Sequence, residues 1–309
     1  MAENPSGMGT WGNAGIWFPA LSQMIVDTPI EGFDMRSLLQ YVKSPYNRWV
    51  IPISQGASTA TVSRVAEGAN IPFNAEPITS QEIVCYKIGE GYPLTREMEM
   101  YQQVNVTQWL FKRLAYKMFH TVNVDIMAAI TAGVPVASTI AATGTSLGQD
   151  GTVFTRAGTF GTYDIEAAKQ AIRENYMSVR DNHIVLLVNP EGARMVEELP
   201  QYNALNQSGF PGWREGAEVD GLTGNIVGTF LVVSNDVPDG EAYLIATRPY
   251  VTRTEQYDPI GFFVESYPLT VMGRDTPQKD GREIYAVHEY GVGIVYGEGT
   301  AKITFAGFS

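Results

Sequence analysis

Residues 57–100 read ASTATVSRVAEGANIPFNAEPITSQEIVCYKIGEGYPLTREMEM, and this stretch decides the fold. It contains two β-prone runs, 59–66 and 82–88, which are separated by about a dozen turn-forming residues that include Pro72 and Pro77. β-branched residues between turn clusters are typical of strands. The pattern predicts a long, open hairpin whose arms reach on the order of 40 Å, at roughly 3.3 Å per residue.

The faces of this hairpin are poorly defined, because polar and apolar residues do not alternate cleanly along it. A two-stranded ribbon of this length is marginally stable alone. Its second face therefore packs either on another molecule or back on its own domain, and the local pattern leaves both open. The tip carries Ile71 and Phe73, two large apolar residues where a solvated loop would carry none.

A long helix is predicted directly after the hairpin. Thr95 is a suitable N-cap, and the carboxylates of Glu97 and Glu99 suit the first turn of a helix. Apolar residues then recur at intervals of four: Leu110, Leu114, Met118, Val122, Ile126 and Ile130. Gly133 and Pro135 end the pattern. The helix runs to about Ala132 and is roughly 55 Å long at 1.5 Å per residue.

Before the hairpin, residues 1–30 are rich in Gly, Pro and Asn and lack any periodicity. They nevertheless contain Trp11, Trp17 and Phe18, which are costly to leave exposed. This composition predicts an extended arm that docks on another surface. A short helix over 33–42, with Asp34 as its cap, and a strand over 49–53 are expected to follow.

After the long helix, residues 135–250 are predicted to form a mixed α/β unit. Its expected elements are an amphipathic helix over 165–179, a buried strand over 183–188, a helix capped by Asn189, a strand over 226–233 and a returning strand over 241–246. Further strands are predicted over 261–272, 284–295 and 302–305. A charged loop, 273–281, joins the first two of these and contains Arg274, Asp275, Lys279 and Asp280.

The overall composition narrows the function. The 309 residues carry a net charge of −12 with no basic run, which argues against electrostatic binding of nucleic acid or of an anionic membrane. Only 17% of residues are charged, which suggests either that much of the surface is covered, for example by copies of the chain itself, or that the chain is a large compact monomer. The single cysteine, Cys85, is expected to be buried. We find neither a signal peptide nor an apolar run of transmembrane length.

Signs of chemistry are few. The three histidines are not at metal-ligand spacing, and nucleophile motifs are absent. Gly291-x-Gly293 and Gly297-x-Gly299 lack the spacing and the following helix of a phosphate loop, so we expect them at strand ends. The sequence therefore predicts no catalytic, metal or cofactor site and a protein that is not an enzyme.

Five motifs in order carry a resemblance. They are Val65-Ala66-Glu67-Gly68-Ala69 with Pro72, Lys87-Ile88 running into Leu94-Thr95-Arg96-Glu97, Ile184 to Pro190, Gly228 to Val233 before Asp239-Gly240, and the C-terminal strands. In this order they resemble the major capsid proteins of tailed bacteriophages and related archaeal viruses, which have the Hong Kong 97-type fold.

The resemblance implies an α+β fold with an N-terminal arm, an extended β-hairpin loop, a long spine helix in a peripheral domain and a mixed α/β axial domain. The implied divisions are an N-terminal arm at 1–30, the first part of the peripheral domain at 31–56, the extended loop at 57–92, the spine helix at 93–134, the axial domain at 135–254 and the peripheral sheet at 255–309.

It also implies contacts between copies. In the extended loop these would involve Arg64, Glu67, Ile71, Pro72 and Phe73; in the arm, Trp11, Trp17 and Phe18; and near three-fold axes, Arg274, Asp275, Lys279 and Asp280. The family's shells consist of pentamers and hexamers and enclose double-stranded DNA without sequence-specific binding. A portal protein, a separate scaffolding protein and possible decoration proteins are the expected partners, with assembly in the host cytoplasm into a virion and no membrane.

Two departures and two alternatives accompany the resemblance. Some members crosslink through a lysine on the extended loop, but this loop has no lysine before Lys87, at its base. Some carry a cleaved N-terminal scaffolding segment, whereas here the fold is expected to begin near residue 30. An encapsulin, a cellular compartment of the same fold that holds cargo enzymes, is one alternative, although its N-terminal helix is not matched here. An ordinary soluble α/β enzyme is the other.

Overall fold

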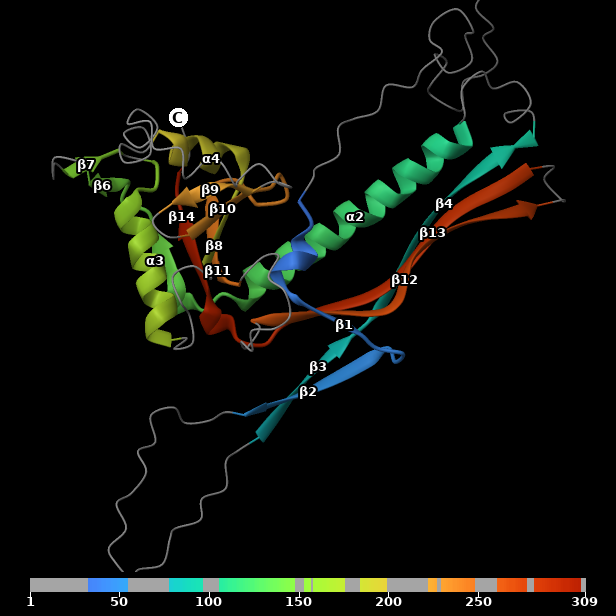
Figure 1. The fold of residues 1–309 in the computed structure, drawn as a ribbon, viewed down its shortest axis with the longest axis horizontal. Helices are drawn as coiled ribbons and strands as arrows, with labels where there is room; N and C mark the ends of the chain where they lie inside the picture. The colour runs from blue at the N-terminus through green and yellow to red at the C-terminus, as the bar shows by residue number, and fades with distance from the viewer. Residues whose placement is uncertain are drawn as a thin grey trace, which may run out of the picture. The chain divides into compact units, whose positions relative to one another are not determined.

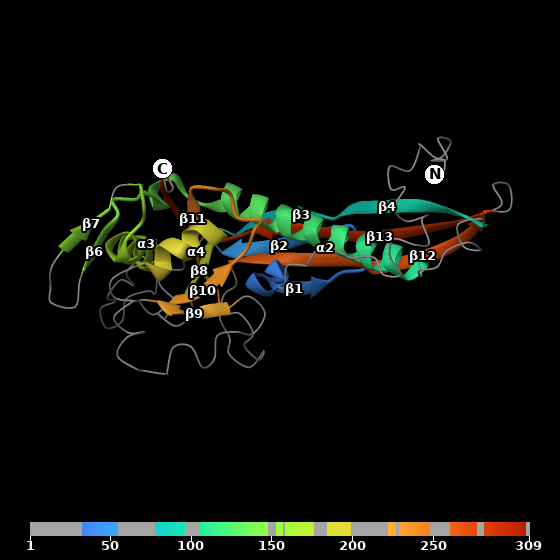
Figure 2. The ribbon, with the colours of Figure 1, turned by 90° about the horizontal axis from the view of Figure 1, so that it is seen from above.

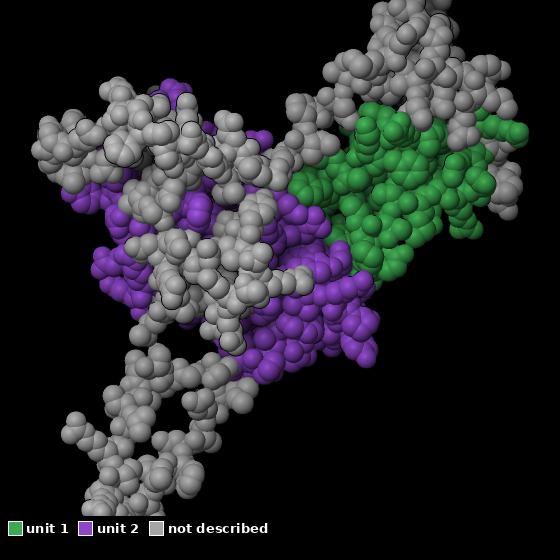
Figure 3. Space-filling model, viewed as in Figure 1, with its two compact units in different colours: residues 1–32, 87–124, 267–289 green, residues 33–86, 125–266, 290–309 purple. Residues whose placement is uncertain are grey.

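The computed structural model describes residues 33–54, 78–96, 106–147, 153–156, 158–175, 184–198, 222–226, 229–247, 260–276 and 281–306. These residues fall into two compact units, shown in Figure 3. One unit contains described residues from 87–124 and 267–289. The other contains described residues from 33–86, 125–266 and 290–306. The fold is α+β, as predicted.

The first unit is built on long strands and one long helix, seen in Figures 1 and 2. A four-stranded sheet has the order β1-β12-β13-β4. Its strands are β1 (Gln40–Lys43), β12 (Gly261–Thr276), β13 (Gly281–Ile294) and β4 (Tyr86–Thr95), of which β4, the far part of β12 and most of β13 belong to this unit. Helix α2 (Val106–Gly133) packs on them through Leu110, Leu114 and Met118, which meet Leu94, Ile284 and Ala286.

The period-four pattern of α2 is confirmed, because all six residues predicted to face inward are at most 7% exposed. The helix ends at Gly133, as expected. Thr95 is the last residue of β4 and the next residue, Arg96, is helical, while Glu97 and Glu99 lie outside the described residues.

The second unit contains a six-stranded sheet of order β5-β14-β11-β8-β10-β9. Its strands are β5 (Thr139–Ala141), β14 (Thr300–Thr304), β11 (Glu241–Ala246), β8 (Ile184–Val188), β10 (Thr229–Val233) and β9 (Leu222–Ile226). Every residue of β8 is fully buried, as its continuous apolar run predicts. Helix α3 (Thr162–Asn175) packs against β5 and β14, and α4 (Pro190–Glu197) packs against β8.

Side-chain caps explain where these two helices begin. The Asn189 side chain accepts a hydrogen bond from the Gly192 amide at 2.7 Å, so its predicted capping role is confirmed. In the first turn of α3, the buried Asp164 carboxylate accepts from the Gly144 amide at 3.0 Å and from the Gly161 amide at 2.7 Å. It thereby joins α3 to the segment that precedes β6 (Thr145–Leu147), which pairs with β7 (Val153–Thr155).

Three strand predictions need correction. The strand predicted over 226–233 is two antiparallel strands, β9 and β10, in which Thr229 pairs with Ile226. The returning strand β11 does not pair with β10, because β8 lies between them, parallel to β10 and antiparallel to β11. The most apolar strand takes the centre, and residues 234–240 are long enough to step over it.

The last strand also differs from expectation. We expected it in the peripheral sheet with β12 and β13, but β14 pairs with β11 and β5 in the six-stranded sheet. Its Ala301 and Ile303 are fully buried there, as a strand between two neighbours requires. The domain boundaries themselves stay a prediction.

The short helix predicted over 33–42 is wrong in its second half. Asp34 caps a single 3₁₀ turn, η2 (Met35–Leu38), and accepts from the Arg36 amide at 3.0 Å. Residues 40–43 then form β1, parallel to β12. Two further 3₁₀ turns are η3 (Val136–Ser138) and η7 (Gly297–Gly299). Of the helices described, none is both long enough and apolar enough to cross a membrane.

Candidate functional site

Most of the residues predicted to contact other copies lie outside the described residues. This holds for Arg64, Glu67, Ile71, Pro72 and Phe73 of the extended loop, for Trp11, Trp17 and Phe18 of the arm, and for Lys279 and Asp280. The first predicted strand of the hairpin, 59–66, lies there too. Their roles stay predictions, and the described structure defines the frame that holds them.

Arg274 and Asp275 are among the last three residues of β12, directly before the charged loop, and both are exposed. The Arg282 Nε atom of β13 lies 3.7 Å from the Asp275 Oδ1 atom. An exposed ion pair of this kind contributes about 0–1 kcal/mol to stability. The pair aligns the ends of the two strands and leaves the Arg274 guanidinium on the surface.

The base of the predicted hairpin is a ribbon formed by β2 (Arg48–Ser54) and β3 (Ile78–Val84), which pair antiparallel along their whole length. The strand predicted over 49–53 is therefore confirmed. The predicted pairing of the run 82–88 with the run 59–66 is wrong for residues 82–84, because these residues pair with Arg48, Trp49 and Val50 of β2. That run is not continuous, because it breaks at Cys85 between β3 and β4.

The inner face of the ribbon packs on the chain's own sheet. Ile51, Ile83 and Cys85 form one apolar cluster with Val264 of β12. The Trp49 ring meets the Phe262 ring edge-on, with centroids 4.9 Å apart. Cys85 is buried, as predicted, and its thiol donates to the Val264 carbonyl at 3.7 Å. For the base of the hairpin, the second face thus lies on its own domain.

The outer face of the ribbon is different in character. Val50 is 56% exposed there and lies opposite Glu82, which pairs with Arg48 at 3.2 Å. At the open end of the ribbon, before Arg48 and after Val84, Tyr46 is 71% exposed and Tyr86 is 69% exposed. Large apolar side chains at this exposure are costly in a protein with no partner. This face can bind another molecule.

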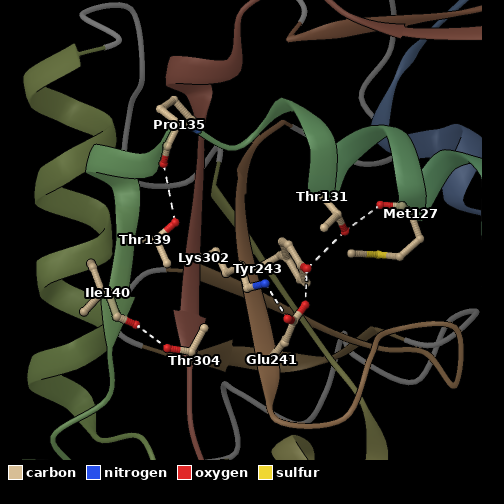
Figure 4. Close-up of polar contacts among 9 residues, drawn as sticks. All are labelled: Met127, Thr131, Pro135, Thr139, Ile140, Glu241, Tyr243, Lys302 and Thr304. Carbon is tan, nitrogen blue, oxygen red and sulfur yellow. Dashed lines mark hydrogen bonds and ion pairs between the residues drawn. The ribbon is translucent and has the colours of Figure 1, made fainter.

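A second polar arrangement holds the last turns of α2 within the second unit, as Figure 4 shows. The Thr131 hydroxyl donates to the Met127 carbonyl at 2.9 Å and lies 3.0 Å from the Tyr243 hydroxyl of β11. That hydroxyl donates to the Glu241 carboxylate, which also accepts from the Lys302 ammonium of β14. The Lys302 nitrogen lies 5.7 Å from the centre of the Tyr243 ring.

A similar contact lies nearer the middle of α2. The Tyr290 hydroxyl of β13 donates to the Asp125 carboxylate at 2.5 Å. Burial, and then the neighbouring carboxylate, raises the pKa of Tyr290 well above its usual range, and the same two causes raise the pKa of Tyr243. Both phenols therefore stay protonated and donate hydrogen bonds to their carboxylate partners. This behaviour suits a structural role and does not suit proton transfer.

These two tyrosines were missed by the sequence reasoning. A signal existed, because Tyr243 interrupts an apolar strand, and a buried tyrosine hydroxyl needs a hydrogen-bond partner. The identity of that partner could not be read, since Thr131 and Lys302 are distant in sequence.

The described part of the chain offers no set of ligands for a metal, since it contains no group of three or more His, Cys, Asp or Glu residues arranged to hold an ion. What the arrangement can do is mechanical. It supports a two-stranded arm and ties a long helix to a buried sheet.

Comparison with known proteins agrees with this architecture and confirms the predicted Hong Kong 97-type fold. A family model described as phage capsid protein matches residues 79–303. The capsid of the cyanophage P-SCSP1u is similar over 98% of this chain and 99% of its own, with a TM-score of 0.67 and 13% identity. The capsid of Ralstonia phage GP4 is similar over 100% of this chain and 98% of its own, with a TM-score of 0.65 and 11% identity. The capsid of a native GTA particle is similar over 99% of this chain and 100% of its own, with a TM-score of 0.65 and 13% identity. No curated protein sequence matches the chain.

Proposed function

Because this chain belongs to the phage capsid protein family, a family of structural proteins and not of enzymes, we propose that many copies of it assemble into an icosahedral shell that encloses a viral double-stranded DNA genome. The family match favours this reading over a cellular compartment that holds cargo enzymes. Pentamers and hexamers are the expected building blocks, and the virion is the expected location after assembly in the host cytoplasm.

The one-sided burial of the β2–β3 ribbon is the observation that carries the proposal. The inner face is fixed on the chain's own sheet, whereas Val50, Tyr46 and Tyr86 remain exposed. Residues 55–77 join the paired ends of this ribbon and contain Ile71 and Phe73. A supported base and an apolar connection suit an arm that clamps a neighbouring copy, with each of these two side chains contributing about 1.5–3 kcal/mol if fully buried.

The remaining expected contacts complete this proposal. Trp11, Trp17 and Phe18 would anchor the N-terminal arm on a neighbour, and Arg274, Asp275, Lys279 and Asp280 would meet their counterparts near three-fold axes. A portal protein, a separate scaffolding protein and, on some shells, a decoration protein would act with the chain. The net charge of −12 suits a wall that encloses DNA without gripping it.

The shell is expected to be non-covalent, because the extended loop has no lysine before Lys87. Boiled, denatured particles should run as one monomer band on a gel. A ladder of multimers would contradict this part of the proposal.

Electron microscopy of purified protein, with sedimentation as a second measurement, tests the proposed function directly. We expect closed particles of uniform size, and DNA inside those purified from infected cells. Finding only monomers or dimers under all salt and scaffold conditions would support the soluble-enzyme alternative. Shells filled with a cargo enzyme would support the cellular compartment.

A further inference from the structure

Two glycines of β13, Gly291 and Gly293, lie directly beneath β3, and we call this pair the glycine seat. A Cβ atom added to Gly291 would lie 2.6 Å from the Val84 carbonyl oxygen. A Cβ atom added to Gly293 would lie 2.5 Å from the Ile83 Cδ1 atom. Real Cβ atoms do not approach other heavy atoms this closely. At Gly291 the nearest atom belongs to the backbone, so β3 can lie this close to β13 only because Gly291 lacks a side chain, whereas at Gly293 the missing side chain leaves room for the side chain of Ile83.

These glycines were expected at strand ends, and the structure confirms this, because they are the fourth-last and second-last residues of β13. Both lie inside β13, which continues to Ile294. Their role is close approach by another segment of backbone, which a glycine inside a strand often marks. The signal in the sequence was the spacing itself, since residues two apart point to the same face of a strand.

Other contacts hold the ribbon at the same height. The Gln81 side-chain amide donates to the Ile294 carbonyl at 3.0 Å, next to the glycine seat. Also on the inner face of the ribbon, Trp49 meets Phe262, and Cys85 meets Val264. The ribbon is therefore fixed in position at several separate points on β12 and β13 of its own chain.

A small change at this base would be amplified along the arm. Strand β2 has seven residues, or about 20 Å at roughly 3.3 Å per residue. Relieving the contact of a Cβ atom at Gly291 with the Val84 backbone requires a lift of about 1 Å, which tilts a base of this length by about 3°. If residues 55–77 extend the hairpin to its predicted reach of about 40 Å, this tilt moves the tip by about 2 Å, more than a closely packed interface tolerates.

We infer that the glycine seat sets the direction in which the hairpin leaves the subunit, and that Gly291 and Gly293 are positioning residues for assembly. The inference rests on the proposed function, in which residues 55–77 clamp a neighbouring copy. It assigns to a contact inside one subunit the control of geometry between subunits.

The test compares three glycine variants of the full chain. Gly293→Ala and Gly291→Ala should each leave about tenfold fewer uniform particles in electron micrographs, because the clash displaces the ribbon. Gly89→Ala is the matched control. It adds the same methyl group within β4, where the nearest atom is the Ala286 carbonyl oxygen at 3.2 Å and β3 is not touched. This control should assemble like the wild type.

A second substitution separates the two positions. Ile83→Ala removes the atoms that clash at Gly293, leaving the Ile83 Cβ atom at 3.8 Å, but it does not remove the Val84 carbonyl oxygen that clashes at Gly291. Ile83→Ala should therefore restore the particles of Gly293→Ala and fail to restore those of Gly291→Ala. Wild-type particles from both single glycine variants, or equal rescue of both, would overturn the inference.

Hydrogen exchange in unassembled subunits covers the remaining outcomes. In Gly293→Ala, amides of β2 and β3 should exchange faster, while those of β8 stay protected. If wild-type protein forms no shells, the proposed function fails, and unchanged exchange in β2 and β3 would separately overturn the inference. If Gly293→Ala does not fold, Gln81→Ala takes its place, since it loosens the ribbon without a clash, and uniform wild-type particles from it would also overturn the inference.

Discussion

The six-stranded sheet and the β2–β3 ribbon bury their side chains in opposite ways. In the sheet, β8 is buried on both faces, and its neighbours β11 and β10 are also mostly buried. In the ribbon, one face packs on the chain's own strands and the other leaves Val50 more than half exposed. The first region is complete within one subunit. We propose that a neighbouring copy covers the exposed face of the second.

The largest expected effect comes from a cavity in the complete region. Leu186, at the centre of β8, is fully buried, so Leu186→Ala should lower the free energy of unfolding of the subunit by about 2–5 kcal/mol. Urea denaturation of unassembled protein measures this change. A loss below about 1 kcal/mol would show that the sheet does not carry the stability of the subunit.

The next effect concerns the polar attachment of α2. Tyr243→Phe removes the hydroxyl that lies between Thr131 and the Glu241 carboxylate. Hydrogen bonds to charged groups contribute about 1.5–3 kcal/mol, and Lys302 still partners Glu241, so we expect a loss of about 1–2 kcal/mol. Tyr163→Phe is the control, because its side chain is nearly half exposed on α3, and it should change nothing measurable.

A titration to alkaline pH tests the same attachment of α2. The pKa values of Tyr243 and Tyr290 are raised by burial and by their carboxylate neighbours, and hydrogen bonding to Glu265 raises the pKa of Tyr41 to about 12. Stability from a raised pKa is fully present below the unfolded value of about 10 and is lost as the pH rises through the folded value. The free energy of unfolding should therefore fall above about pH 10. The free energy of unfolding should fall less steeply with pH in a double variant that combines Tyr243→Phe and Tyr290→Phe. An equally steep fall would contradict these pKa shifts.

The smallest expected change in subunit stability comes from the ribbon's outer face. Val50→Ser should alter the free energy of unfolding by less than about 0.5 kcal/mol, because the side chain is exposed in the subunit. Its yield of particles should nevertheless fall, as measured by sedimentation. The control Val136→Ser changes a valine that is 91% exposed after α2, and its particle yield should match the wild type. Equal particle yields from both variants would show that the outer face of the ribbon does not contribute to assembly.

Sequence reasoning succeeded where one local pattern decides the structure. The period-four stripe of α2, the apolar run of β8 and the Asn189 cap each depend on residues close in the chain, and the structure confirms all three. Where partners are distant in sequence, the pattern was silent. Nothing local places β8 between β10 and β11, or β14 beside β5.

The ribbon shows both outcomes within one element. A strand over 49–53 was predicted, and the structure shows its Trp49, Ile51 and Ile53 side chains packed on β12 and β3. The surface beneath it could not be predicted, because the spacing of Gly291 and Gly293 acquires its meaning only from the crossing of β3. The candidate contacts of the hairpin's far residues came from the resemblance alone and stay predictions.

The most direct test of the central claim changes the residues that we expect to reach a neighbour. The claim is that the buried sheet stabilises the subunit while the hairpin joins subunits, so Ile71→Ser combined with Phe73→Ser should separate the two properties. We predict that circular dichroism and melting of the isolated subunit stay near wild type while the yield of particles collapses. Normal assembly of the double variant, or early melting of the isolated subunit, would contradict the account.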